Sequence, residues 1–270
     1  MAKLEISVYS LESARTAAAA GADRLELCAG FPEGGTTPTP GLFHAVKASV
    51  SIPVRVIVRP RGGDFVLSPE ETEILADDIA LFRDLGADGF VFGALDPEGN
   101  VDTAACSRLL AAASGKPCVF HRAFDLSRDP HEAFAAITGL GFQGLLSSGQ
   151  AAQAPAGAAM LAELVRRAPP GFEVIPGCGL SPANLAALHA AVQAPVYHAS
   201  ATVWHDSPMR FRRAGVFMNQ ETADRECRRQ GVNDEAARSM KLIVINYRLL
   251  GKKQYQGVFF PSKAGFFSQM

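Results

Sequence analysis

The chain has few cysteines, and their spacing is not that of a disulfide or zinc framework. Among 270 residues there are five, with no C-x-x-C pair. An odd number of scattered cysteines argues against both a disulfide scaffold and a structural zinc finger. We therefore expect reduced thiols at Cys28, Cys106, Cys118, Cys178 and Cys227.

Excess charge and long apolar runs are also missing. The formal net charge is −1, so the chain has no general attraction to nucleic acid or anionic lipid. No apolar run is long enough to cross a bilayer. The opening apolar stretch is interrupted by Glu5, which is unlike a secretory signal. These absences predict a cytoplasmic protein that binds neither nucleic acid nor membrane.

A repeating unit is what the chain does contain: a stretch rich in Ala and Leu, a glycine turn, and a short β-branched or aromatic run. Gly-Ala-Asp stands at 21–23 and again at 86–88, and Gly141 opens a third such joint. Glycine ends a helix because it adopts the left-handed conformation without steric cost. Strands that alternate with helices in this way indicate parallel βα units. The predicted strands are 4–8, 24–28, 54–59, 89–92, 118–121, 144–147, 172–176 and 196–199.

Eight such units predict a single (β/α)8 barrel over residues 1–250. A doubly wound sheet is the alternative, but residues 8–13 lack the G-x-G-x-x-G expected after its first strand. Residues 201–232 form an insertion that we expect to lie over one mouth of the barrel, before a helix capped by Asn233. Residues 251–270 repeat no βα unit. The sequence leaves open whether this tail is flexible or docks on a partner subunit.

Strand residues alternate between two faces, so each strand sorts its side chains by parity. In the first strand Leu4, Ile6 and Val8 share one face, which leaves Glu5 and Ser7 on the other. The aliphatic faces should meet the surrounding helices, and the polar faces should point into the barrel. The same parity places further residues inside: Arg24, Glu26, Cys28, Arg55, Arg59, His198 and Ser200.

Polar residues gather at the carboxyl ends of the strands, where barrel enzymes place their sites. Arg59 ends the third strand and Arg61 follows it, so we expect both at the rim of a polar pocket. Structural ion pairs, such as one between Glu26 and Arg59, are the alternative. Burying unpaired charges is costly, which favours an open pocket. The ionisable residues expected to converge there are Glu5, Glu26, Arg59, Arg61, His121 and His198.

Two arginines and two loops indicate a small anionic ligand. Arginine presents a planar fork of donors suited to phosphate or carboxylate, a role that we expect of Arg59 and Arg61. After the seventh strand, residues 176–184 combine glycines with a helix start capped by Ser181, which is a ready anion site. A second loop of small residues lies at 147–149.

Proton transfer and soft-metal binding are the two chemistries that these residues allow. Glu26 and His121 are the candidates for general acid and base. Thiolate selects Cu(I), and two thiolates make a good low-coordinate site. Cys28 is the best thiol candidate, because its parity faces the pocket while that of Cys118 faces the helices. A lone buried cysteine that serves only as a small hydrophobe is the alternative.

Five stretches of the sequence together resemble the motif set of the CutC family, the copper homeostasis proteins. The ordered series spans nearly the whole chain, and the combination of RPRGGDF with FHRAFD is highly specific. The resemblance implies a cytoplasmic (β/α)8 barrel that self-associates as a dimer or tetramer, has a role in copper tolerance and is reported to bind Cu(I). The stretches are GADRLELC (21–28), EGGTTP (33–38), RPRGGDF (59–65), FHRAFD (120–125) and SG (148–149).

One departure from the family bears on copper. The family's copper proposal pairs a thiol on the first strand with the thiol that matches Cys28, but Ser7 stands in that first place. A hydroxyl is a poor Cu(I) ligand, so the two-thiol site is broken. Three hypotheses stay open: a copper protein that contacts the metal through Cys28, an enzyme acting on a small anionic metabolite, and a non-catalytic oligomeric scaffold.

The enzyme hypothesis names a set of substrate-binding residues beside the acid and base. Most are hard, hydrogen-bonding groups and are not typical Cu(I) ligands. The predicted set is Glu5, Arg59, Arg61, Asp64, Arg122, Asp125, Ser148, Gly149, Gly177, Gly179, His198 and Ser200.

Overall fold

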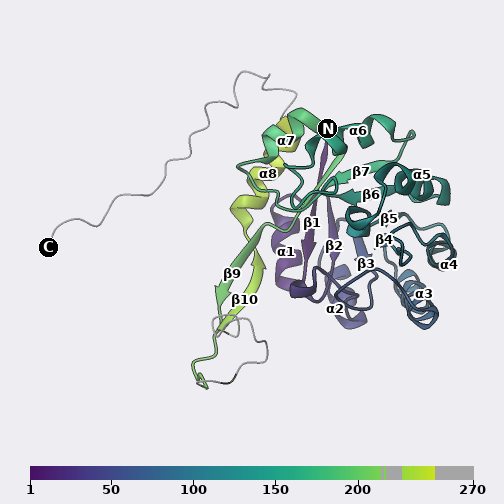
Figure 1. The fold of residues 1–270 in the computed structure, drawn as a ribbon. Coiled ribbons are helices and arrows are strands. Elements are labelled where there is room, and N and C mark those ends of the chain that lie inside the picture. The colour runs from purple at the N-terminus through teal and green to yellow at the C-terminus, as the bar shows by residue number, and fades with distance from the viewer. Residues whose placement is uncertain (214–215, 217–226, 247–270) are drawn as a thin grey trace.

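The computed structural model describes residues 1–213, 216 and 227–246. Eight parallel strands form a nearly closed barrel with helices around it (Figure 1), which confirms the predicted (β/α)8 fold over the doubly wound sheet. The barrel strands are β1 (Lys3–Val8), β2 (Arg24–Leu27), β3 (Val54–Ile57), β4 (Gly89–Phe92), β5 (Cys118–Phe120), β6 (Gly144–Ser147), β7 (Glu173–Pro176) and β8 (Val196–Ala199).

Helices follow the strands, and their ends have local causes. They are α1 (Leu11–Ala19), α2 (Pro40–Lys47), α3 (Pro69–Asp84), α4 (Thr103–Ala113), α5 (Pro130–Leu140), α6 (Ala158–Arg167), α7 (Leu185–Val192) and α8 (Asp234–Asn246). Ser68 and Glu71 cap the start of α3 reciprocally. Gly141 ends α5 at a φ of 91°. Among the described residues, no helix has the length and apolar character needed to cross a membrane.

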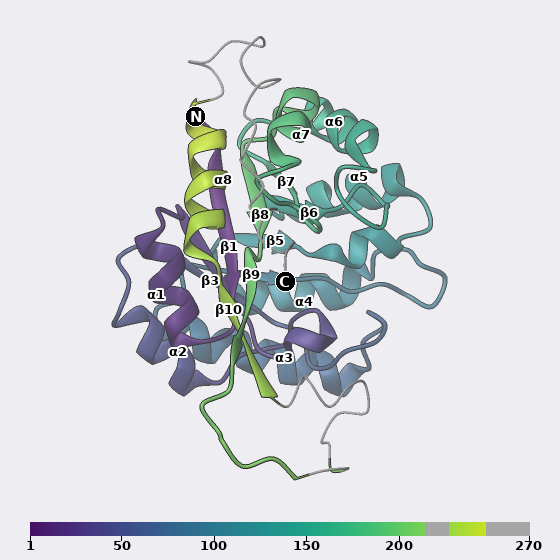
Figure 2. The same ribbon diagram turned by 90° about the vertical axis from the view of Figure 1, so that its left-hand side faces the viewer.

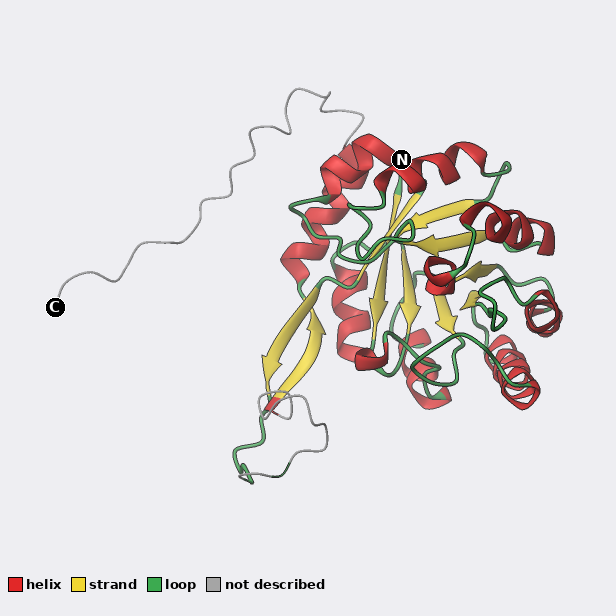
Figure 3. Cartoon of the chain, viewed as in Figure 1, coloured by secondary structure: helices red, strands yellow, loops and turns green. Residues whose placement is uncertain are grey.

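The helices surround the strands (Figure 3), and the apolar core divides into two clusters as strand parity predicts. Leu4, Ile6 and Val8 of β1 are buried in the large apolar cluster shared with the helices. A second, smaller apolar cluster fills part of the barrel interior, and its members alternate with the outward-facing residues. It contains Val91, Val119, Leu146, Ile175 and Val196.

The barrel is closed by packing at one seam. Neighbouring strands are hydrogen-bonded in the order β7-β6-β5-β4-β3-β2-β1-β8. β7 and β8 lie in contact, but within the described residues no ladder joins them. The described parts of β7 and β8 therefore meet through packing and not through a ladder of backbone hydrogen bonds.

The insertion after β8 forms an arm, which we define as the antiparallel hairpin of β9 (Thr202–Asp206) and β10 (Arg228–Val232). The described part of the arm projects outward from the barrel (Figure 2), so the expectation that it lies over the mouth is wrong for those residues. Trp204 packs edge-on against Phe31 at 5.8 Å, and β10 lies in contact with α1, so these contacts hold the arm to the barrel.

Asn233 caps α8 as predicted, because its side-chain oxygen accepts the N–H of Ala236 at 2.9 Å. The predicted C-terminal tail, residues 251–270, lies outside the described residues.

Candidate active site at the mouth of the barrel

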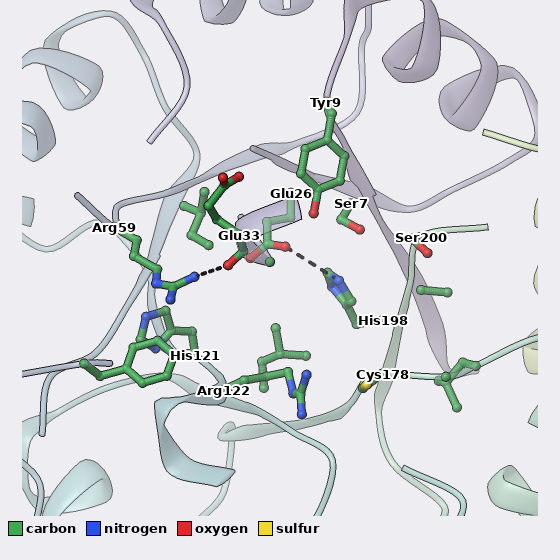
Figure 4. Close-up of a pocket in the computed structure, with 17 residues that line it drawn as sticks. Ser7, Tyr9, Glu26, Glu33, Arg59, His121, Arg122, Cys178, His198 and Ser200 are labelled. Carbon is green, nitrogen blue, oxygen red and sulfur yellow. Dashed lines mark hydrogen bonds and ion pairs between the residues drawn. The ribbon is translucent and has the colours of Figure 1, made fainter. Parts of the chain in front are cut away.

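A cavity of about 350 Å³ opens at the carboxyl ends of the strands (Figure 4). Its size falls at the lower end of the range for small-molecule sites. Seven of the predicted site residues line it: Glu26, Arg59, His121, Arg122, Gly179, His198 and Ser200. The pocket predicted from the strand ends is therefore present.

Beneath the cavity lies a buried ion-pair network that explains why charge is tolerated inside this barrel. Arg24 pairs with Glu5 and also with Glu173, at 3.0 Å from the latter. Arg55 lies 3.2 Å from Glu173 and 3.7 Å from Glu5. Burial alone would raise the pKa of Glu5, but Arg24, His198 and Arg55 outweigh burial and hold that pKa well below its usual range. Glu5 is thus a permanent anion under the pocket rather than part of its lining.

His198 is clamped between two carboxyl groups. Its Nδ1 lies 2.8 Å from Oε1 of Glu5, and its Nε2 lies 3.6 Å from Oε2 of Glu26 (Figure 4). Burial would lower the pKa of His198, but the charges of Glu26 and Glu5 raise it above its ordinary value. Because Glu5 fixes Nδ1, the opposite ring nitrogen is turned toward Glu26 and the cavity.

Glu26 is the carboxyl group that the environment makes titratable. Burial raises its pKa, although the neighbouring His198 acts in the opposite direction. Its Oε1 is buried and has no hydrogen-bond partner in the part of the chain that the structure describes. A carboxyl group with a raised pKa beside an imidazolium has the properties of a general acid or base.

His121 lines the same cavity in a different protonation state. Burial and the nearby cation of Arg59 lower its pKa to about 3. Its Nδ1 accepts the backbone N–H of Ala123 at 3.4 Å, so Nε2 carries the proton of the neutral ring. His121 therefore suits a hydrogen-bond donor, and His198 is the better partner for Glu26 in proton transfer.

Arg59 holds two loops together, which changes its predicted role. Its Nη1 donates to the carbonyls of Glu33 at 2.6 Å and Gly35 at 3.2 Å, and its Nη2 donates to Gly63 at 2.8 Å. The guanidinium also stacks over Phe65 at 4.7 Å. The Arg59–Glu26 ion pair considered above is not formed. With most of its donors committed to carbonyls, Arg59 shapes the pocket wall rather than clamping an anion.

Arg61 and Asp64 lie outside the cavity, contrary to their predicted place at its rim. Arg61 pairs with Asp64 at 3.3 Å and with Glu71 at 2.7 Å, and all of these contacts are on the solvent side. The chain turns outward at the two glycines after Arg61, so the parity of β3 no longer applies there.

Arg122 is positioned by a cluster of hydrogen bonds behind the pocket wall. Its Nε donates to Asp125 at 2.8 Å, and its Nη2 donates to Ser148 at 3.2 Å. Asp125 in turn accepts the hydroxyls of Ser147 at 2.6 Å and Ser148 at 2.9 Å. Gly149 donates its N–H to Ser147 at 2.8 Å. Asp125, Ser148 and Gly149 thus support the cavity without lining it.

The loop after β7 departs from the predicted helix start. α7 begins at Leu185 after Asn184, so the expected cap at Ser181 is wrong. Gly179 lines the cavity with a φ of 72°. Gly177 lies beside the ring of His198 and does not line the cavity. An added Cβ would stand 2.6 Å from a methyl group of Leu146 and 3.3 Å from Cβ of His198, so a larger residue would displace these side chains.

Sequence reasoning missed Tyr9, Glu33 and Phe65 among the residues that line the cavity, and Glu173 in the ion-pair network. Tyr9 directly follows β1, and Phe65 ends the RPRGGDF stretch that follows β3. Their places after strand ends could have indicated that both line the cavity. Glu33 lies in the EGGTTP motif, but nothing in the surrounding sequence indicates which way its side chain points. Glu173 was missed because it reaches Arg24 from another part of the barrel.

Comparison with known proteins identifies the family of this chain. The sequence model of the CutC family matches residues 2–203. The chain belongs to the CutC family. The human copper homeostasis protein cutC homolog is 44% identical over 80% of this chain and 79% of its own length. A family protein CutC of Enterobacter sp. (strain 638) is 43% identical over 90% of this chain and 98% of its own.

A solved structure of the CutC family agrees with the fold. The putative copper homeostasis protein CutC from Streptococcus agalactiae gives a TM-score of 0.70 at 29% identity, over 74% of this chain and 99% of that one. Phosphoribosyl anthranilate isomerase from Thermotoga maritima gives 0.54 at 12% identity, over 90% of this chain and 98% of that one. This second likeness concerns the barrel alone.

The donor set does not fit the Cu(I) site that the CutC family implies. Cys28 is only 1% exposed, and its Sγ lies 3.6 Å from Oε2 of Glu26. Burial and the charge of Glu26 raise the pKa of Cys28 well above its ordinary value, so Cu(I) would have to displace a strongly held proton to bind the thiolate. Tyr9 interacts with both Cys28 and Ser7. No cluster of three metal-binding side chains occurs among the described residues.

Proposed function

We propose that this chain serves copper homeostasis, the role for which its human and mouse relatives are named, as an acid–base enzyme acting on a small anionic metabolite. The observation that carries the enzymatic part is the clamping of His198 between Glu5 and Glu26 beside an open cavity. A purely structural ion pair would not need a cavity against its titratable member.

Each group of the pocket has a distinct task in this proposal. Glu26 exchanges a proton with the ligand, because its raised pKa brings it closer to neutral pH. The imidazolium of His198 stabilises the carboxylate that forms when Glu26 gives up its proton. Glu5 stays ionised and holds the ring in place. The neutral ring of His121 donates a hydrogen bond to an oxygen on the ligand.

Direct binding of Cu(I) through Cys28 is the finer claim that the family resemblance suggests. The thiol lies behind Glu26 and carries a raised pKa, which favours a role in packing. We therefore propose that the link to copper runs through the reaction of the pocket and not through a Cu(I) ligand set.

Self-association and a cytoplasmic location accompany this proposal. The exposed side chains of Met209 and Phe211, each 60% accessible, give the insertion an apolar surface that a second copy of the chain would cover. Light scattering across a range of concentrations tests this. A monomer at every concentration would remove both the oligomer and the scaffold hypothesis.

A thermal-shift screen of phosphorylated and carboxylated metabolites tests the enzymatic proposal. We expect at least one compound to stabilise the parent protein, and Glu26→Gln to change the response to that compound. Glu12→Gln, on the outer helix α1, is the matched control and should respond like the parent. A uniformly silent panel would count against the enzyme.

A further inference from the structure

We propose that the pocket binds a phosphate group on the side formed by Arg122 and the loop that follows β7. This inference rests on the proposed function, because it names the anion that the metabolite carries. It assigns the anion to a different arginine from the pair that the sequence suggested.

Arg122 is the lining cation with donors to spare. Asp125 and Ser148 fix its Nε and Nη2, whereas Nη1 has no acceptor among the described residues. The side chain of Arg122 is 41% exposed and lines the cavity. It is therefore a pre-positioned charge with free N–H groups, unlike Arg59, whose Nη1 and Nη2 already bind loop carbonyls.

Backbone donors belong to the lining of the same cavity. Cys178 and Gly179 follow β7 with φ values of 79° and 72°, and both line the cavity together with Leu180. The N–H groups of residues 178–180 have no acceptor within the described part of the chain, which leaves them available to a ligand.

The arrangement of donors favours a tetrahedral oxyanion. One edge of the Arg122 guanidinium is already used, so the remaining donors approach from two different walls rather than as one planar fork. Figure 4 places Arg122 and Cys178 on one side of the cavity, and Glu26 and Glu33 on the other. A phosphate at the first side is kept away from the carboxylates. The rest of the ligand then reaches toward Glu26 and His198.

Binding of inorganic phosphate, followed by calorimetry at low ionic strength, tests the subsite. We expect Arg122→Gln to weaken phosphate affinity by about 10- to 100-fold, since it removes a charge-assisted hydrogen bond. Arg108→Gln is the matched control, because Arg108 is exposed and, among the described residues, forms its ion pair with Glu73 on the outer helices. It should leave the affinity unchanged.

Three outcomes overturn the subsite: no binding by the parent protein, equal affinity in Arg122→Gln, or equally tight binding of acetate. The acid–base proposal is tested separately, because phosphate alone does not reach Glu26. We expect Glu26→Gln to bind phosphate at least as tightly as the parent. If the protein binds phosphate but shows no catalytic activity, the phosphate subsite is supported and the acid–base enzyme proposal is contradicted.

Discussion

His198 and Glu5 are register partners on β8 and β1, and their side chains meet inside the barrel at 2.8 Å between Nδ1 and Oε1. Glu5 also pairs with the buried arginines Arg24 and Arg55. The imidazole that faces the cavity is thus anchored to the ion-pair network beneath it. A change in that network should therefore alter the pKa of His198.

Glu5→Gln should lower the pKa of His198, because it removes the charge that favours the protonated ring. It should also lower the free energy of unfolding by about 3 kcal/mol, since Arg24 and Arg55 lose a buried partner. NMR titration of the histidine ring and urea unfolding measure both effects. Glu12→Gln is the control. An unchanged His198 titration would contradict the anchoring role.

Glu26→Gln should be more stable than the parent protein, by an amount that grows as the pH rises. The folded-state pKa of Glu26 lies above its unfolded value, so its contribution to stability is present at low pH and is lost as pH rises through the folded pKa. The glutamine variant has no carboxyl group to ionise inside the fold. Its free energy of unfolding relative to the parent should therefore rise by on the order of 1 kcal/mol between pH 5 and pH 8. Urea unfolding at the two pH values measures the gain. A constant difference between the proteins would show that Glu26 does not titrate in this range.

His121 should weaken the protein in acid. Its folded-state pKa of about 3 lies below the ordinary value of 6.5, so its contribution is present above 6.5 and is lost as pH falls toward 3. His121→Gln removes this titration. The variant should therefore lose less free energy of unfolding than the parent as the pH falls, by about a few kcal/mol at most. Unfolding experiments between pH 7 and pH 4 provide the comparison. A parallel acid limb in both proteins would mean that the ring is charged in the fold.

Cys28→Ser should leave competition for Cu(I) against a calibrated chelator unchanged, because the buried thiol keeps its proton. Cys178→Ser, which removes a partly exposed thiol at the pocket, is the comparison variant. Loss of Cu(I) affinity in Cys28→Ser alone would reinstate Cys28 as a metal ligand.

Arg59→Lys should loosen the loops that Arg59 joins, because one ammonium cannot reproduce a planar fork that reaches three carbonyls. We expect faster amide hydrogen exchange in residues 30–36 and 60–65, with a loss of about 1–3 kcal/mol of stability. Arg108→Lys, at an exposed arginine on the outer helices, is the control. Equal exchange in both variants would contradict the loop-joining role.

Strand parity predicted which face of each strand carries the site, because alternation is a local property of extended chain. Glu26 and His198 were placed correctly for this reason. The second partner of Arg24 could not be found in this way, because Glu173 stands on β7, which is not a neighbour of β2 in the strand order. Such contacts depend on long-range geometry.

Loop residues escaped prediction for a related reason. Whether Arg59 faces a ligand or the carbonyls of its own loops depends on the backbone path of 30–36 and 60–65, which the motif letters do not fix. The direction of the arm is also non-local, because it follows from the packing of Trp204 on Phe31.

Transfer of solvent deuterium to a bound metabolite tests the acid–base site most directly. The full chain is incubated in D₂O with phosphorylated and carboxylated metabolites, and incorporation is followed by mass spectrometry. The account predicts incorporation into at least one compound, slowed by about 10²- to 10⁴-fold in Glu26→Gln. Incorporation at the same rate in both proteins, or into no compound at all, would contradict it.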